Sequence, residues 1–300
     1  MQESFGDIAE SRHWRKVEFF DKGWSSDRKY YIETDDGRKL IIRLADISQY
    51  QRKVAEYEAI MAIRRLGLEM SQPIDFGTCD DGKEVYILLS WVEGQSLEVA
   101  LPLLDTKEQY DLGAAAGTML RRIHSISAPE GQLDWEGRML TKINKRTTQY
   151  LRCGYRVPNE ETLMRFINGN LHYLKNRPQT LQHGDFHPGN LILTSGKQLG
   201  IVDFNRTDYG DPWEEFVRVP AFTKNVSIPF ALGQIKGYFN GPVPQLFFQL
   251  LALYSAIDAH FGVVWAIPFG QAEIDSSVAR SRSVYEDFNG FETCIPVWYK

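Results

Sequence analysis

The sequence predicts an α+β protein of two lobes: a small five-stranded antiparallel lobe with one helix over residues 1–92, and a larger, mainly helical lobe over residues 93–300. The length of 300 residues exceeds the size at which a single hydrophobic core usually stops growing. Short strand patterns separated by turn residues dominate the first part, and long amphipathic helical patterns dominate the second. We therefore expect a cleft between two lobes.

The first lobe alternates strands with turns and contains one helical pattern. In chain order, the predicted elements are the strands 17–20, 29–34 and 39–45, the helix 50–67, and the strands 73–78 and 84–92. Asp-Asp-Gly at 35–37 is a hairpin signal between the second and third strands, and Gly67 is a normal C-terminal stop for the helix. These signals predict an antiparallel sheet with a helix after its third strand.

The second lobe is predicted to be helical, with only two brief strand patterns, at 190–193 and 199–204. The predicted helices span 107–127, 159–177, 212–224, 227–238, 243–263 and 272–288. The longest apolar stretch, 245–269, contains Asp258 and His260, so we interpret it as a core helix and not as a membrane span.

Composition argues against several classes of protein. The formal net charge of −5 and the pI of about 5.8 do not fit a nucleic-acid-binding protein, which normally shows a basic face, and they fit a cationic partner better. The three cysteines are widely spaced and form no C-x-x-C pair, so neither a disulfide framework nor a structural zinc site is predicted. Since the N-terminus also has no apolar signal region, we expect a cytoplasmic protein.

The stretch "LQHGDFHPGNLIL" (181–193) concentrates polar residues between two apolar ends. In an extended segment alternate residues face the same way, so His183, Asp185 and His187 could bind zinc together, as in a metallohydrolase. They could also satisfy the backbone groups of a surface turn. Both interpretations are open from these residues alone.

A third interpretation includes two more residues, Asn190 and Asp203. The pattern H-x-D-x-x-x-x-N, followed by an Asp at the end of a buried strand, is the layout of phosphoryl transfer in eukaryotic-type kinases. In that layout an Asp orients the acceptor hydroxyl and accepts its proton, while an Asn and a second Asp hold magnesium through oxygen ligands. The zinc interpretation leaves Asn190 and Asp203 without a role.

"HGDFHPGNLIL" followed by "GIVDF" resembles the signature of the aminoglycoside phosphotransferase family, small-molecule kinases that also include macrolide and choline kinases. The resemblance implies a protein-kinase-like bilobal fold, ATP or GTP as co-substrate, and Mg²⁺. It implies that Asp185 is the catalytic base and that Asn190 and Asp203 are the magnesium ligands. His183 and His187 match the loop of the family, where we expect packing and organising roles.

The nucleotide side departs from the protein-kinase pattern, since the chain has neither G-x-G-x-x-G-x-V nor a Walker A motif. Between the first two strands, one Gly with Ser25 and Ser26 is expected to form a phosphate-covering loop. On the third strand Arg43 stands where a protein kinase has Lys, and its guanidinium can pair with phosphate and with carboxylate. We expect Glu56 of the following helix to be its partner, with Glu58 as the alternative.

The segment "LLSWVEG" joins the two predicted lobes. By its place in the series it is expected to offer backbone hydrogen bonds to a purine, with Ser90, Trp91 and Val92 as candidates. Trp91 could equally be a core residue at the lobe interface.

Carboxylates that follow the second metal ligand are candidates for contact with the acceptor. An aminoglycoside is a polyamine, and in the family the acceptor lies near this region, so we predict acceptor contacts from Asp208, Glu215 and Asp258. Asp211 before Pro212 is better explained as a helix N-cap. The aromatic C-terminal part could instead line an apolar pocket for a macrolide.

The sequence thus predicts a kinase that transfers the γ-phosphoryl group of ATP or GTP to a hydroxyl of a small molecule, with an aminoglycoside antibiotic as the favoured acceptor and antibiotic resistance as the role. Alternatives are a kinase of the same fold for a macrolide, choline, a sugar or an amino-alcohol, a nucleotide-binding pseudoenzyme, and the metallohydrolase. We expect a monomer with a cationic small-molecule partner and without nucleic-acid or membrane partners.

Overall fold

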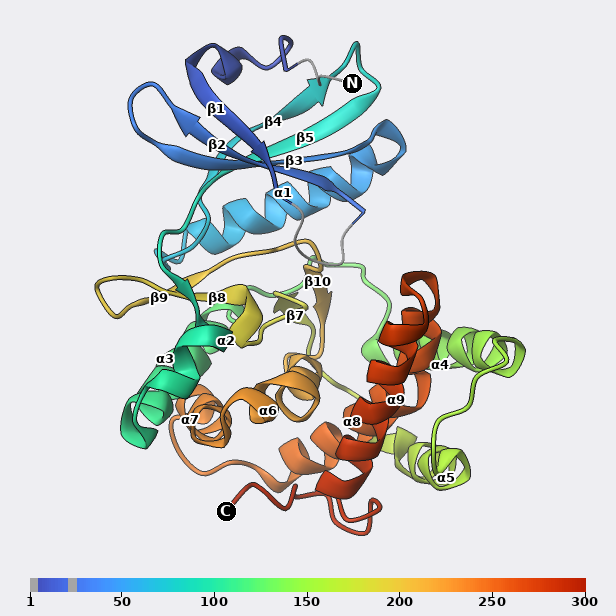
Figure 1. The fold of residues 1–300 in the computed structure, drawn as a ribbon. Coiled ribbons are helices and arrows are strands. Elements are labelled where there is room, and N and C mark those ends of the chain that lie inside the picture. Colours follow the sequence, from blue (N-terminus) through green and yellow to red (C-terminus); the bar gives the residue numbers. More distant parts are fainter. Residues whose placement is uncertain (1–4, 21–25) are drawn as a thin grey trace. The chain divides into compact units, whose positions relative to one another are not determined.

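The structure, a computed structural model, describes residues 5–20 and 26–300 (Figure 1). The predicted α+β class is confirmed, since a five-stranded antiparallel sheet is combined with many helices. The chain forms two compact units. The first consists of Met1–Leu97 and Gly189–Thr207, and the second of Glu98–Pro188 and Asp208–Lys300.

The first unit is built on a sheet with strand order β1-β2-β3-β5-β4, antiparallel throughout. Its strands are β1 (Trp14–Phe19), β2 (Arg28–Thr34), β3 (Lys39–Asp46), β4 (Pro73–Cys79) and β5 (Glu84–Ser90), and its helix is α1 (Tyr50–Arg64). Helix α1 follows β3 and lies along one face of the sheet (Figure 1). The predicted order of five strands with one helix after the third is confirmed.

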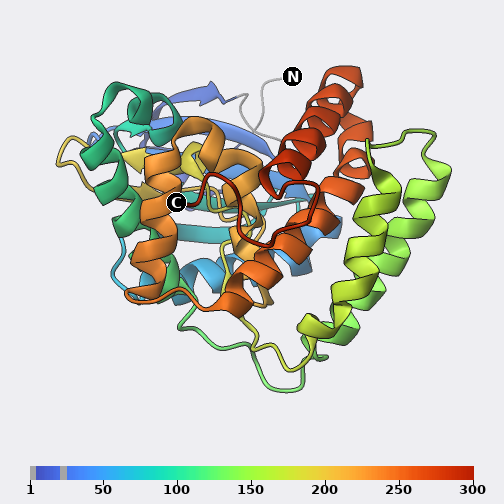
Figure 2. The ribbon, with the colours of Figure 1, turned by 90° about the horizontal axis from the view of Figure 1, so that it is seen from below.

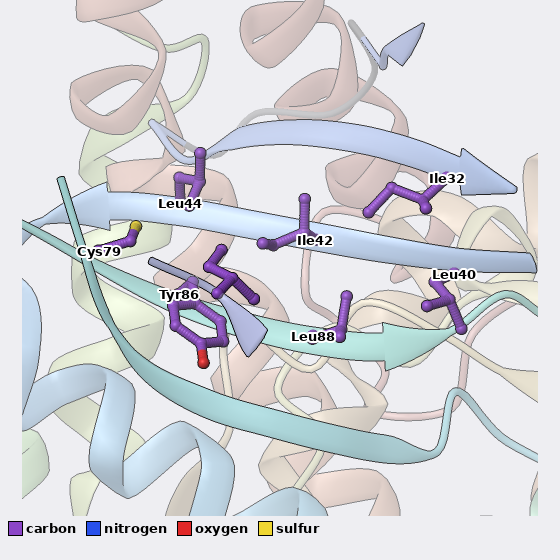
Figure 3. Close-up of a cluster of buried hydrophobic side chains, with 8 residues drawn as sticks. Ile32, Leu40, Ile42, Leu44, Cys79, Tyr86 and Leu88 are labelled. Carbon is purple, nitrogen blue, oxygen red and sulfur yellow. The ribbon is translucent and has the colours of Figure 1, made fainter. Parts of the chain in front are cut away.

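The other face of this sheet carries a compact apolar cluster (Figure 3). Its buried members are Ile8, Ile32, Leu40, Ile42, Leu44, Cys79, Tyr86 and Leu88. Because side chains alternate along a strand, Leu40, Ile42 and Leu44 of β3 enter this cluster while Arg43 points to the opposite face. The period of two therefore brings a buried arginine onto the face of the sheet that carries α1.

A second, three-stranded sheet attaches a distant segment to the first unit. Strands β6 (Gln95–Ser96), β8 (Leu191–Leu193) and β9 (Leu199–Ile201) pair in the order β6-β8-β9. Ile201 also donates its N–H to Glu69 O at 2.9 Å and accepts from Ser71 N at 3.0 Å. The predicted boundary after residue 92 differs from this division, because such pairing between distant segments leaves no local signal in the sequence.

The second unit is mainly helical. Its helices are α3 (Thr106–Ile123), α4 (Trp135–Arg152), α5 (Glu160–Asn170), α6 (Lys224–Val226), α7 (Ile228–Phe239), α8 (Gln245–Ala266) and α9 (Gln271–Asp287). Strands β7 (Thr180–Gln182) and β10 (Asp208–Gly210) form a short antiparallel pair. The predicted helix over 212–224 is wrong, since this region forms a 3₁₀ turn at Glu214–Val217 and a π-helical turn at Val219–Thr223 that contains Pro220.

Helix α4 was not predicted, because its sequence is strongly polar and only Trp135, Met139, Ile143 and Tyr150 are buried. Helix α8, in contrast, is the core helix that the sequence predicts. It belongs to the segment 245–269, which is long and apolar enough to cross a membrane by length and composition only, and 72% of the most apolar window of that segment is buried inside the protein.

Helices α3 and α7 lie side by side (Figure 2), in contact through glycines. A Cβ atom on Gly117 of α3 would lie 2.0 Å from Gln234 O of α7, and one on Gly233 of α7 would lie 2.1 Å from Tyr110 O of α3. The two backbones therefore approach too closely for any side chain at these positions.

We predict that Gly117→Ala destabilises the protein by about 1–3 kcal/mol or more, because a backbone of one helix must move to admit the methyl group. Gly169→Ala in α5 is the matched control, since a Cβ atom there meets nothing within 4 Å. Alanine at that helical position should raise stability by up to about 1 kcal/mol. Urea unfolding measures both, and equal effects of the two variants would contradict the close packing of α3 on α7.

A second prediction concerns His260, a buried residue of α8 whose ring packs on Tyr150 with centroids 4.5 Å apart. Desolvation by burial lowers the pKa of His260 to about 4 from 6.5. The histidine of the unfolded chain therefore binds a proton near pH 6.5, whereas His260 of the folded chain binds it only near pH 4. The free energy of unfolding should fall by up to about 3 kcal/mol as the pH falls through this window.

The variant His260→Phe should lose this part of the pH dependence, and His172→Phe at an exposed position should keep it. Unfolding midpoints measured at several pH values between 4 and 7 make the comparison. An unchanged slope in His260→Phe would show that another group is responsible.

Candidate active site

The residues of the "HGDFHPGN" motif are divided between the two units. The boundary falls between Pro188 and Gly189, so Asp185 belongs to the second unit, whereas Asn190 and Asp203 belong to the first. Each half of the motif is thus positioned by contacts inside its own unit.

In the first unit, one hairpin brings the two predicted magnesium ligands to the same end. Strands β8 and β9 pair with Leu191 opposite Ile201, so Asn190 immediately precedes one strand and Asp203 follows the other by two positions. The backbone oxygen of Asn190 accepts a hydrogen bond from Val202 N at 3.1 Å. The chain thus places both residues at the same end of the hairpin.

Asp203 has an unusual backbone conformation, and one oxygen of its carboxylate has no hydrogen-bond partner. Its φ of +63° lies in the left-handed region, which is uncommon for residues other than glycine and is often found at functional sites. Its Oδ1 is buried and makes no hydrogen bond, and it lies 3.7 Å from Arg43 Nη1. Its Oδ2 lies 3.6 Å from Lys29 Nζ. Carboxylate and amide oxygens fit a hard cation such as Mg²⁺, which takes few protein ligands and completes its shell with water and phosphate.

Arg43 is the centre of a buried charge network between β3 and α1. Its Nη1 donates to Glu56 Oε1 at 2.5 Å, and its Nη2 donates to Asp27. Lys53 Nζ donates to the same two carboxylates, at 2.6 Å to Asp27 and 2.9 Å to Glu56. The predicted pairing of Arg43 with Glu56 is therefore present, and Glu58 is exposed.

The network balances charges that would be costly alone. Arg43, Lys53, Asp27 and Glu56 are each buried to within a few per cent of complete, and a buried charge is tolerated only when it is paired. Burial alone would raise the pKa of Asp27, but Arg43 and Lys53 outweigh it and lower that pKa. Sequence reasoning missed Asp27 and Lys53, although Lys53 stands three residues before Glu56 on the same helix, a spacing that makes them neighbours.

In the second unit, Asp185 is held by an arginine that sequence reasoning also missed. Arg218 Nε lies 3.1 Å from Asp185 Oδ1, and Arg218 Nη2 donates to Gly184 O at 3.2 Å. Burial alone would lower the pKa of Arg218, but Asp185 and other nearby carboxylates outweigh it and raise that pKa. No local signal marks Arg218, because it follows a turn that the sequence predicts as regular helix.

The two histidines of the motif have packing and loop-organising contacts. His183 Nδ1 accepts a hydrogen bond from Asp185 N at 3.3 Å, and the His187 ring stacks on Phe222 with centroids 5.2 Å apart. His187 Nε2 is 3.8 Å from Asp185 Oδ2. Among the described residues, no group of three or more His, Cys, Asp or Glu side chains is placed to hold a metal ion, so the zinc arrangement of this motif is not found.

The class of this protein follows from its similarity to a known family. The model of the phosphotransferase enzyme family matches residues 16–247, which is more than half of the chain. The chain belongs to this family. It is a phosphotransferase that acts on a hydroxyl acceptor. Among the curated proteins, none matches its sequence.

Solved structures of other kinases share the fold of this phosphotransferase. Wild-type aminoglycoside 2'-phosphotransferase-IIIa with GDP has a TM-score of 0.67 at 15% identity, over 94% of this chain and 95% of that chain. Amicoumacin kinase with AMP-PNP, Ca²⁺ and Ami has a TM-score of 0.65 at 13% identity, over 93% and 90%. A choline/ethanolamine kinase family protein from Mesorhizobium loti has a TM-score of 0.64 at 14% identity, over 92% and 90%. The predicted kinase-like fold is confirmed.

The segment predicted to contact the purine is largely committed to the sheet of the phosphotransferase. Ser90 N donates to Gln72 O at 2.8 Å, and Trp91 N donates to Lys39 O at 2.9 Å. The Trp91 ring packs edge-on against Tyr31, with centroids 5.0 Å apart. The N–H groups of Ser90 and Trp91 are therefore already used within the fold, and the predicted purine contacts of these two residues stay predictions. The predicted role of Val92 stays a prediction, and Val92 itself is buried.

Of the two serines predicted to cover the phosphates, one lies within the described residues. Ser26 is exposed just before β2. Ser25 lies outside the described residues.

Glu215, one of the predicted acceptor carboxylates, is buried inside the phosphotransferase. It is fully buried and accepts hydrogen bonds from His183 N at 3.0 Å and from Gly184 N at 2.6 Å. A further contact, at 3.1 Å, joins it to His124 Nε2. Glu215 thus anchors the loop that contains Asp185 from inside and offers no exposed oxygen to an acceptor, which corrects the prediction for this residue.

The other predicted acceptor carboxylates are more accessible. Asp208 has a side chain that is 65% exposed and pairs with Arg138 Nη2 at 2.9 Å. Asp258 is half-buried on α8. Asp211, predicted as an N-cap, does accept from Trp213 N at 3.0 Å but is fully buried, where it also receives two hydrogen bonds from Arg177.

We predict that Glu215→Ala destabilises the phosphotransferase by about 3–5 kcal/mol, because it leaves His124 and the backbone N–H groups of His183 and Gly184 without their buried acceptor. Asp208→Ala, a matched removal of one carboxylate, should stay within about 0.5 kcal/mol of the wild type. Thermal and urea unfolding measure the difference. Similar small losses in both variants would mean that Glu215 does not anchor the loop.

Proposed function

We propose that this phosphotransferase transfers the γ-phosphoryl group of ATP or GTP to a hydroxyl of a small molecule. The acceptor oxygen forms a bond to the γ-phosphorus while the bond from that phosphorus to the bridging oxygen breaks, and the nucleoside diphosphate leaves with the electron pair. Asp185 orients the hydroxyl and accepts its proton. The observation that supports this most is the positioned pair of Asn190 and Asp203 at one hairpin end, close to the Arg43 network.

Asn190 and Asp203 would hold Mg²⁺, which when bound neutralises charge on the phosphates. Solved structures that share the fold are described with ATP, AMP-PNP with Ca²⁺, and GDP, which supports a nucleotide co-substrate. The contacts of Asp185 with Arg218, and of its loop with Glu215, hold the proton acceptor in one orientation. Positioning and charge neutralisation are the main means by which phosphoryl transfer is catalysed.

For the acceptor, we propose an aminoglycoside, so that the enzyme confers antibiotic resistance. Aminoglycoside phosphotransferases recur among the solved structures with this fold, and Asp208 and Asp258 remain as carboxylates for a cationic acceptor. Choline or ethanolamine is the second candidate, supported by a kinase of that family with a similar fold. We further propose a cytoplasmic monomer, consistent with three cysteines that are all unpaired.

A screen that couples ADP or GDP release to a colour reaction tests this function, with aminoglycosides, macrolides and choline as acceptors. We expect turnover with one class only, and loss of turnover when EDTA removes divalent cations. Asp185→Asn should retain nucleotide binding, measured by calorimetry, and lose about 10²- to 10⁴-fold in kcat.

Lys16→Met, at an exposed position on β1, is the control and should keep full activity. Wild-type kcat in Asp185→Asn would remove Asp185 from the reaction. Nucleotide binding without turnover on any acceptor would favour the pseudoenzyme.

A further inference from the structure

The face of the sheet that carries Arg43 holds a second buried cation, on the neighbouring strand. Lys29 of β2 stands directly opposite Arg43 of β3 in the antiparallel ladder, and only 6% of it is exposed. Side chains directly opposite each other in such a pair project to the same face. Lys29 therefore faces the same region as Arg43, and its Nζ lies 3.6 Å from Asp203 Oδ2.

The guanidinium of Arg43 is engaged by carboxylates on both of its terminal nitrogens. Nη1 donates to Glu56 and Nη2 to Asp27, and Nε is buried without a hydrogen bond. Lys53 closes the network by bridging the same two carboxylates. To bind a phosphate through its fork, Arg43 would have to give up one of these buried ion pairs, which is costly in a low-dielectric site.

Lys29 differs from Lys53 in its surroundings. Lys53 donates hydrogen bonds of 2.6 and 2.9 Å to Asp27 and Glu56, the carboxylates that also hold Arg43, whereas Lys29 lies beside Asp203, with 3.6 Å between Nζ and Oδ2. A lysine ammonium is a compact charge with three donors on a flexible stem, so it can turn from a carboxylate to a phosphate oxygen at little cost in geometry. Its neighbour Asp203 is the residue that we propose as a magnesium ligand.

We propose that Lys29 supplies the phosphate-binding cation of this enzyme, and that Arg43 is a positioning residue that holds Glu56 and Asp27. In protein kinases one lysine makes both contacts. Here Arg43 of β3 makes the ion pair with the helix, and Lys29 of β2 contacts the phosphates. The ligand is the polyphosphate of a nucleoside di- or triphosphate. This inference rests on the proposed function, since it requires that a nucleotide binds.

The competing explanation is structural: Lys29 could serve only to neutralise Asp203. The two explanations differ in which part of the nucleotide would lose affinity. A phosphate-binding lysine affects ADP and ATP but not adenosine, whereas a structural lysine affects all three alike through the fold.

The experiment is calorimetric titration of Lys29→Met and of the wild type with ADP, ATP and adenosine, and with the guanine series in parallel. We expect Lys29→Met to bind the polyphosphates about 10- to 100-fold more weakly and adenosine within about twofold of the wild type, as loss of a charge-assisted hydrogen bond predicts. Lys29→Arg should keep most of the affinity. Lys16→Met removes the same charge from exposed surface and should change no affinity.

Unchanged ADP affinity in Lys29→Met would overturn the assignment of Lys29 and leave the proposed function intact. An equal loss for ADP and adenosine would also overturn it, in favour of the structural role. A wild-type protein that binds no nucleotide of either series would overturn the proposed function, and the assignment of Lys29 with it. Should Lys29→Met not fold, Lys29→Gln, which keeps a polar group beside Asp203, gives the same comparison.

Discussion

The cost of burying charge controls how the first unit is built around Arg43. An arginine in the middle of an apolar strand is tolerated because Glu56 and Asp27 meet its two terminal nitrogens, and these carboxylates are in turn shared with Lys53. Each member fixes another: β3 is tied to α1, and the residue before β2 is tied to both. The same arrangement fixes the direction of Arg43, which lies 3.7 Å from Asp203. Folding and preparation of the site thus depend on the same ion pairs.

The second unit also buries charged groups, here carboxylates that are satisfied by backbone and side-chain donors. Glu215 is buried under the loop that carries Asp185 and accepts hydrogen bonds from two consecutive N–H groups, while Asp211 accepts hydrogen bonds from Arg177 and Tyr254. Because an unsatisfied acceptor at either position would be costly, neither carboxylate can leave its partners. The loop that carries Asp185 therefore rests on a rigid polar base although it contains little regular secondary structure.

Much of this could be predicted where the signal is local. Strand alternation around Arg43, the spacing to Glu56 and the spacing from Asp185 to Asn190 are all contained in short stretches of sequence. Lys29 could not be found in this way, because its relevance depends on which residue of β3 stands opposite it. Asp27 could not be found either, because its contacts with Arg43 and Lys53 join segments that are distant in sequence. The sequence predicts Glu215 as an acceptor contact because the identity of an acidic residue does not show whether its side chain is buried. Helix α4 was missed since its buried positions are few and its surface is strongly polar.

The ion pair between Asp185 and Arg218 bears on the role proposed for Asp185. Arg218 fixes the direction of the Asp185 carboxylate, because its Nε lies 3.1 Å from Asp185 Oδ1. In a loose phosphoryl transfer the acceptor hydroxyl keeps its proton until late, so a strong base brings little advantage and a fixed direction brings much. On this argument the contribution of Arg218 to the proposed reaction is the orientation of Asp185. The proposed function accordingly assigns Asp185 to alignment of the hydroxyl first and to proton removal second.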